Sequence, residues 1–178
     1  MRQDILKRRG YTLSDFWEHH HHQPLSAPIP EVMLPEGYGV RALGDVDELP
    51  APSFLSWKAF HPEEPLDRYD SWEWSLNIQH APFYRQDLDL IAISPDGEFA
   101  SFCTIWLTRC GAFEPAGTAP EHQRRGLGKT VIAEGLCRLK DLGAEMVFIG
   151  SGSAEAYAFY TSVGFTEWDK SEIWEKDL

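Results

Sequence analysis

The sequence predicts an α+β fold in which a twisted, mixed but mostly antiparallel sheet is flanked by helices. Three observations lead to this prediction. Strand-like runs joined by turn residues fill 88–118, a helical pattern of apolar residues follows over 131–142, and shorter strand, helix and strand patterns complete the chain. With 178 residues, 43% of them hydrophobic, the chain has the size and apolar content of one ordinary domain.

The composition of residues 1–36 indicates an N-terminal segment distinct from the main domain. Its end is rich in proline, which is typical of an extended linker, so we expect the domain to span residues 37–178. His19–His22 form a run of histidines. A fortuitous or flexible tract explains this run better than a metal site, because no second cluster of ligands accompanies it.

Short elements are expected next. Residues 38–43 predict a strand, and Asp45 and Glu48 have the spacing of a capping box ahead of a helix at 49–60. Residues 72–79 alternate apolar and polar side chains with the period of a strand.

The stretch 61–98 is acidic and aromatic. It has only two basic residues, Arg68 and Arg85, against acidic residues at positions 63, 64, 67, 70, 73, 87, 89, 96 and 98. Together with Trp72 and Trp74, these carboxylates predict the wall of a binding pocket that selects a cationic amine. The alternative is that these tryptophans belong to the core.

The central sheet is expected in 88–118. Residues 88–94 and 98–107 are strand-like and are joined by Pro95-Asp96-Gly97, whose Pro and Gly favour a tight turn, so they predict a hairpin. Residues 110–118 then add a third antiparallel strand.

A helix is the best-supported element after the sheet. Apolar residues recur at helical spacing and Gly143 suits its C-terminal cap; the apolar positions are Val131, Ile132, Leu136, Leu139 and Leu142. A strand at 145–150, a helix at 154–162 and two strands at 165–168 and 173–176 are expected to follow.

Charge and composition exclude several classes of partner. The chain has 28 acidic against 16 Lys and Arg residues, and its net charge of -12 repels nucleic acid phosphates and anionic lipid. Cys103, Cys110 and Cys137 lack paired spacing, which favours reduced thiols, a cytoplasmic protein and no metal site. No apolar stretch reaches the roughly 20 residues of a membrane span, and the N-terminus lacks the apolar core of a signal peptide.

The clearest functional motif is the segment 118–130, between an expected strand and an expected helix. A helix N-terminus has unpaired N–H groups and a positive dipole end, so it binds anions such as pyrophosphate. Gly126 and Gly128 let the backbone approach a phosphate closely. A Walker A loop, which would bind ATP, is disfavoured because it requires glycine at position 123, which is Gln.

Two motifs together resemble a known family. The order Gln123-x-x-Gly126-x-Gly128 at the start of a helix resembles the acyl-CoA signature of the GNAT superfamily of N-acyltransferases. Residues 153–165 are similar to the family's Asn-x-x-Ala-x-x-x-Tyr-x-x-x-Gly-Phe helix, with Ser153 in place of the usual Asn. The resemblance covers roughly residues 110–168.

The resemblance implies a binding site for acetyl-CoA. The backbone of Ala116, Gly117 and Thr118 would line the pantetheine arm. The pyrophosphate would bind the loop Gln123, Arg124, Arg125, Gly126, Leu127, Gly128, Lys129 and Thr130, whose three cations stand out in an acidic chain. Ser153 and Ala156 would complete the site, although the serine shortens or loses the contact that Asn makes to the pantetheine amides.

Two side chains are candidates for catalysis. Tyr160 lies where the family places a tyrosine near the thioester sulfur, and a phenol can protonate a departing thiolate; the alternative is a tyrosine packed in the core. Glu114 is the best candidate for the base that deprotonates the amine, since it shares strand parity with Ala116 and Thr118 if no bulge intervenes. The alternative is an exposed strand carboxylate.

The sequence thus favours an enzyme that transfers an acetyl group from acetyl-CoA to a primary amine of a small molecule by direct attack. A protein or peptide N-acetyltransferase and a non-catalytic acyl-CoA-binding module stay open as alternatives. A homodimer is compatible with the sequence. Residues 6–17 resemble the closing strand of a preceding GNAT unit, as in a tandem arrangement. Such a segment would add a strand to the sheet; the alternative is a solvated leader.

Overall fold

The structure is a computed structural model that describes residues 2–176. The chain divides into two compact units. The larger unit is residues 24–147, and the smaller unit combines residues 2–23 with residues 148–176. Within residues 2–176, no helix is long and apolar enough to cross a membrane.

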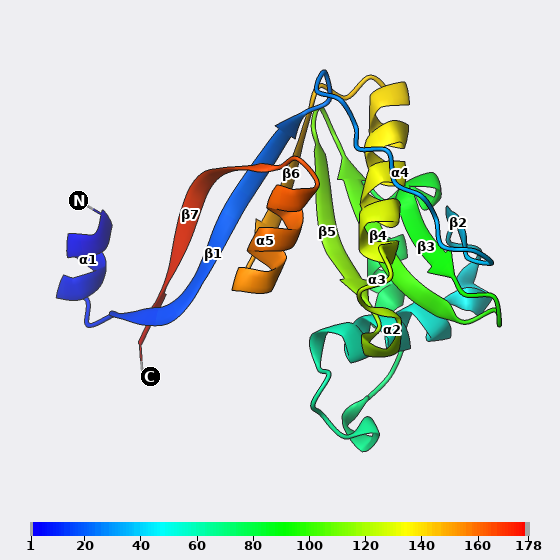
Figure 1. Cartoon of the computed structure of the whole chain (residues 1–178). Coiled ribbons are helices and arrows are strands. Elements are labelled where there is room, and N and C mark those ends of the chain that lie inside the picture. Colours follow the sequence, from blue (N-terminus) through cyan, green and yellow to red (C-terminus); the bar gives the residue numbers. More distant parts are fainter. Residues whose placement is uncertain (1, 177–178) are drawn as a thin grey trace. The chain divides into compact units, whose positions relative to one another are not determined.

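The larger unit contains four antiparallel strands in the order β2-β3-β4-β5 (Figure 1). Their bounds are β2 Gly39–Ala42, β3 Asp89–Ile93, β4 Phe99–Leu107 and β5 Gly111–Thr118. Gly97 has a φ of 85° and its N–H donates to the Ser94 carbonyl, closing the turn between β3 and β4. The predicted hairpin and its third strand are confirmed.

Helices cover both faces of these strands. Helix α4 (Leu127–Asp141) packs on the face that carries Ile105 and Phe113, and a Cβ on Gly135 would overlap both side chains. Helix α2 (Pro50–Phe60) packs on the opposite face, where Phe102 lies in a buried cluster with Leu55. Because both faces are covered, β4 is buried from residue 100 to residue 105. The predicted α+β class is confirmed.

The strand predicted at 72–79 is wrong. This stretch contains a short helix, α3 (Ser75–Gln79). The alternating apolar residues form two i,i+4 pairs on different sides of a helical turn. Trp72 and Leu76 pack against the core cluster, whereas Trp74 and Ile78 line a pocket.

The predicted capping box is also absent. Asp45 precedes a 3-10 helix (Val46–Glu48) but its side chain caps nothing. The Glu48 carboxylate instead accepts the Gly44 N–H at 2.7 Å and forms a two-point ion pair with Arg41. The Arg41 hydrogen bond lowers the pKa of Glu48. Further 3-10 turns lie at Leu66–Arg68, Gln86–Leu88 and Pro120–His122.

The smaller unit contains α1 (Arg2–Arg8), most of β1 (Thr12–Pro24), α5 (Ala154–Ser162) and β7 (Thr166–Glu175). Strand β6 (Met146–Ser151) starts at the end of the larger unit and continues into the smaller one, where the strand order is β6-β1-β7. Strands β1 and β7 are antiparallel, with Thr12 opposite Glu175 and His22 opposite Thr166.

Two predictions for these residues need correction. His19–His22 are not a flexible tract but the second half of β1, and His21 is fully buried. The two strands expected at 165–168 and 173–176 are one strand, β7. The polar residues between them stay extended because the backbone of β1 pairs with them.

Candidate functional site

The loop between β5 and α4 has free space beside Gly126. Gly126 is the N-cap residue of α4 with a φ of 85°, and a Cβ there would meet no atom within 4 Å. Its carbonyl accepts the Thr130 N–H at 3.1 Å, the first bond of the helix. No side chain of the described residues caps α4. The first N–H groups of the helix therefore point toward a space that an anion can occupy.

Cations of this loop differ in how they are held. The Arg125 guanidinium donates to the Tyr38 hydroxyl at 3.1 Å and to the Glu121 carbonyl at 3.3 Å. Within residues 2–176, Arg124 and Lys129 form no ion pair, so both charges are available to a ligand. Lys58 pairs with the Glu121 carboxylate and offsets the negative charge nearest the loop.

Gln123 links the loop to the end of β5 by a hydrogen bond. The Gln123 side-chain amide donates to the Thr118 carbonyl at 3.4 Å, and the Thr118 hydroxyl shares a hydrogen bond of 2.8 Å with Ser101. His122 is buried and contacts the Tyr38 hydroxyl at 3.0 Å. Gln123 thus holds the loop against the end of β5.

A bulge interrupts β5 ahead of the loop. Ala116 lies opposite Cys103 and Phe113 opposite Ile105, so two residues of β5, Glu114 and Pro115, oppose the single residue between those partners. The bulge breaks the regular alternation, and Glu114 therefore loses the strand parity with Ala116 and Thr118 on which its selection depended. Its side chain is exposed, and its carbonyl accepts the Trp106 indole N–H at 2.6 Å.

The second motif forms helix α5 in the smaller unit. Ser153 is the N-cap, and its hydroxyl accepts the Ala156 N–H at 3.1 Å. The serine therefore performs the structural task of a helix cap, which Asn also performs. Tyr160 is buried, with its ring 6.0 Å from His21, 5.2 Å from Phe159 and 6.2 Å from Phe165.

The structure thus assembles the predicted residues in two groups. The larger unit brings Ala116, Gly117 and Thr118 together with the loop that runs from Gln123 to Thr130. The smaller unit places Ser153, Ala156 and Tyr160 on α5. Among residues 2–176, no three His, Cys, Asp or Glu side chains are arranged to hold a metal ion.

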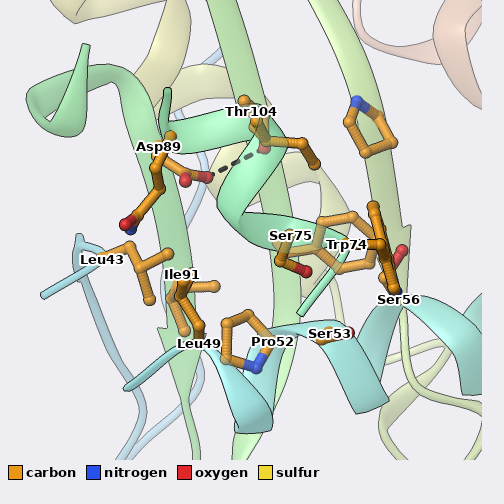
Figure 2. A pocket seen from close by; sticks show the side chains of 14 residues that line it. Leu43, Leu49, Pro52, Ser53, Ser56, Trp74, Ser75, Asp89, Ile91 and Thr104 are labelled. Atoms are coloured by element: carbon orange, nitrogen blue, oxygen red, sulfur yellow. Dashed lines mark hydrogen bonds between the residues drawn. The ribbon is translucent and has the colours of Figure 1, made fainter. Parts of the chain in front are cut away.

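A pocket on the larger unit was not predicted from the sequence. It lies between α2, α3 and strands β3 and β4 and has a cavity volume of about 40 Å³ (Figure 2). Trp74, Ile91 and Phe102 supply apolar walls, and Ser56, Ser75 and Thr104 supply hydroxyls. Of the carboxylates in the acidic stretch 61–98, Asp89 alone is among the described residues that line it.

Asp89 is the unusual residue of this pocket. The residue is 6% exposed. Its Oδ1 accepts a hydrogen bond from the Thr104 hydroxyl and its Oδ2 accepts one from the Tyr84 hydroxyl, each at 2.9 Å. Burial raises the pKa of this carboxyl, and burial together with Asp89 raises the pKa of Tyr84. A carboxylate inside the apolar run 88–93 is the sequence signal that could have found it, since acidic residues are rarely fully buried.

Comparisons with known proteins agree with this geometry. A model of the acetyltransferase (GNAT) family matches residues 46–165. Mycothiol acetyltransferases of Salinispora tropica and Salinispora arenicola are 28% and 31% identical, over 82% of this chain and 50% of each relative. The chain therefore spans about half the length of these curated relatives.

A solved structure shares the fold. The crystal structure of a GCN5-related N-acetyltransferase from Sphaerobacter thermophilus superposes with a TM-score of 0.74 at 19% identity, covering 97% of this chain and 54% of that one. At this low identity, the likeness to the solved structure shows the fold alone. The match to the family model covers more than half of the chain and shows the family. The chain therefore belongs to the GNAT family of acetyltransferases.

Proposed function

We propose that this chain transfers an acetyl group from acetyl-CoA to the primary amine of a small molecule. The observation that carries the proposal is the start of α4, which no side chain within residues 2–176 caps and where a Cβ on Gly126 would meet no atom within 4 Å. Arg124 and Lys129 lie in the same loop and form no ion pair with those residues. Such a loop suits the pyrophosphate of a coenzyme. A small pocket on the larger unit favours a small acceptor over a protein, which needs a shallow groove.

The proposed reaction is a direct attack. The neutral amine forms a bond to the thioester carbon while the bond from that carbon to sulfur breaks, and the nitrogen loses one proton as the thiolate gains one. We assign the thiolate's proton to the Tyr160 hydroxyl. Glu114 keeps its proposed role as the base, acting through water from its exposed position, although the bulge removes the parity argument for it.

The proposed domain division also rests on indirect support. We propose that residues 37–178 form the acetyltransferase domain. The half-length match to the curated relatives is compatible with one unit of a tandem protein. Strand β1 lies between β6 and β7 in the strand order, which is compatible with a segment that takes the place of a closing strand.

The first test is a calorimetric titration with acetyl-CoA. Gly126→Glu places bulk and negative charge in the open space, so binding should fall below detection. Gly143→Glu is the matched control, because Gly143 follows the other end of α4, has a φ of 79° and also has no atom within 4 Å of a Cβ. Both variants introduce the same backbone strain and charge, but only the first one blocks the proposed site.

The outcomes separate the alternatives. If the unmodified protein does not bind acetyl-CoA, the proposal fails. If it binds and Gly143→Glu weakens binding as much as Gly126→Glu, the loop is not the site. Binding without turnover on any of a panel of amines would favour the acyl-CoA-binding module. With turnover, Tyr160→Phe should lower kcat by about 100-fold or more if the phenol is the acid.

A further inference from the structure

We propose that the Asp89 pocket binds a second, non-reacting ammonium group of the acceptor, so that the preferred acceptors are compact diamines or polyamines. This inference rests on the proposed function and names the class of substrate. It is carried by four properties of the pocket: an uncompensated buried carboxylate, a lining without cations, neighbouring hydroxyl and aromatic groups, and a small volume.

The buried carboxylate lacks a cationic partner. Asp89 forms no ion pair with any residue between 2 and 176, and its two hydrogen bonds come from the neutral hydroxyls of Thr104 and Tyr84. A charged group buried without a counter-ion is costly. Each carboxylate oxygen can accept a further hydrogen bond, so a ligand ammonium would offset this cost directly.

The rest of the lining is suited to a cation. Among the described residues, Asp89 is the one charged side chain that lines the pocket, so no Lys or Arg repels an ammonium. The Ser56, Ser75 and Thr104 side chains offer hydroxyl oxygens, and Trp74 offers an aromatic ring. Figure 2 shows Trp74 and Ser75 on one side of the pocket and Asp89 and Ile91 on another.

Volume and access limit the size of the group. A water needs about 10–15 Å³ on the same measure, so about 40 Å³ holds an ammonium with a short alkyl stem but no sugar ring. Trp74 is 46% exposed, which lets the remainder of an acceptor extend toward solvent beside it.

The ammonium in this pocket is not the reacting one. An ion pair with a carboxylate favours the protonated amine. A protonated nitrogen has no lone pair and cannot attack a thioester. The acceptor therefore needs another nitrogen that is neutral in the reaction, which is why a diamine fits and a monoamine does not exploit the pocket.

The test compares 1,4-diaminobutane with 1-aminobutane as acceptors for acetyl-CoA. The unmodified enzyme should prefer the diamine in kcat/KM by about 10–100-fold, the range expected of a hydrogen bond to a charged group. Asp89→Asn should remove this preference by lowering kcat/KM for the diamine much more than for 1-aminobutane. Glu73→Gln, at an exposed position outside the pocket, is the control for loss of one negative charge and should keep the preference.

Several results would overturn the inference. Equal kcat/KM for both amines in the unmodified enzyme would overturn it. Because this comparison needs no variant, the inference can be tested even if Asp89→Asn fails to fold. An unchanged preference in a folded Asp89→Asn enzyme would exclude the pocket. Equal loss with both amines would instead indicate a catalytic or structural role.

A binding measurement separates this inference from the proposed function. Calorimetric titration with 1,4-diaminobutane needs no acetyl-CoA and no turnover. Binding that Asp89→Asn abolishes and Glu73→Gln retains would support the pocket even if every acetylation assay failed. Acetylation of 1-aminobutane without diamine binding would support the enzyme and exclude the pocket.

Discussion

Arg124 is held in an unfavourable backbone conformation. Its φ of 62° makes it the one non-glycine residue with a positive φ among residues 2–176. A side chain in this region costs roughly 1–2 kcal/mol, and such strain often persists at functional positions. We expect Arg124→Gly to raise the free energy of unfolding by about 0.5–1 kcal/mol, after allowing for the greater entropy of glycine in the unfolded chain.

The same substitution should weaken acetyl-CoA binding, because it removes a free cation from the loop. Urea denaturation and calorimetric titration measure the two effects. Arg125→Gly removes the same charge but also the hydrogen bond to Tyr38, and should lower stability. The strain argument fails if both variants destabilise the protein equally.

His21 should make the protein sensitive to acid. Burial lowers its pKa from the ordinary 6.5, whereas Glu167 acts in the opposite direction and His19 and His20 reinforce the decrease. As pH falls through 6.5 the unfolded chain binds the proton before the folded one does, so this residue makes stability decrease toward its lowered pKa. Thermal melts should show a smaller decrease in Tm between pH 7 and pH 5 for His21→Gln than for the unmodified protein.

An exposed histidine provides the control. His80→Gln lies just after α3 and should leave the pH dependence of Tm unchanged. If His21→Gln and the unmodified protein lose the same Tm on acidification, burial of this imidazole does not limit acid stability.

Single residues differ in how far the sequence identifies their tasks. The glycines and cations of the loop are adjacent in sequence, so their chemistry could be predicted as a group. Asp89 could not be linked to Thr104 and Tyr84, because side chains from β4 and from the turn before β3 meet it only in the folded unit. The parity argument for Glu114 failed because a bulge leaves no clear trace in the sequence.

At the scale of elements, the packing of α4 on the sheet requires a glycine at position 135. A Cβ on Gly135 would lie 2.5 Å from Ile105 Cδ1 and 2.6 Å from Phe113 Cε1, both in the buried core. Alanine normally stabilises a helix interior by about 1 kcal/mol relative to glycine. Here the overlap reverses the sign, and we expect Gly135→Ala to lower the free energy of unfolding by about 1–3 kcal/mol.

Chemical denaturation with urea measures this change. Cys137→Ala, on the exposed side of the same helix, is the control and should change stability by less than about 0.5 kcal/mol. A stabilised Gly135→Ala protein would mean that α4 can move away from β4 at little cost.

Elements with one clear period were predictable, and mixed patterns were not. Helix α5 has the predicted bounds. Helix α4 contains four of the predicted apolar positions, whereas Leu142 is its C-cap residue and is exposed. Residues 72–79 fit a strand or two helical pairs equally well over so few residues, and contacts with the core and the pocket decide between them. The histidine run has no apolar period, yet pairing with β7 makes it a strand.

For the molecule as a whole, the free thiols of Cys103 and Cys137 can report on global unfolding. Cys103 is fully buried in β4 and burial raises the pKa of its thiol. Desolvation also raises the pKa of Cys137, but this residue is exposed and reagents can reach its thiol. Only the thiolate reacts with alkylating reagents. Iodoacetamide should therefore label Cys137 in the native protein and Cys103 only in step with global unfolding, as measured by mass spectrometry. Early labelling of Cys103 would show that the sheet of the larger unit opens locally.

The α+β class follows from the order of strand and helix patterns, so the sequence was sufficient for it. The division into two units was not predictable in the same way. The smaller unit combines residues 2–23 with residues 148–176, and no local pattern reveals that such distant segments pair. Long-range pairing depends on complementary packing, which composition and period do not encode.

The pairing of β1 with β7 has a consequence for synthesis on the ribosome. Strand β1 is made first, but its partner in β7 ends at Glu175, and the whole larger unit is translated in between. At 5–20 residues per second, β1 waits on the order of 10–30 s for that partner. During this interval the nascent chain has a strand with an unpaired edge, the kind of surface that chaperones shield. The rate of translation through residues 25–175 therefore sets how long that edge stays exposed.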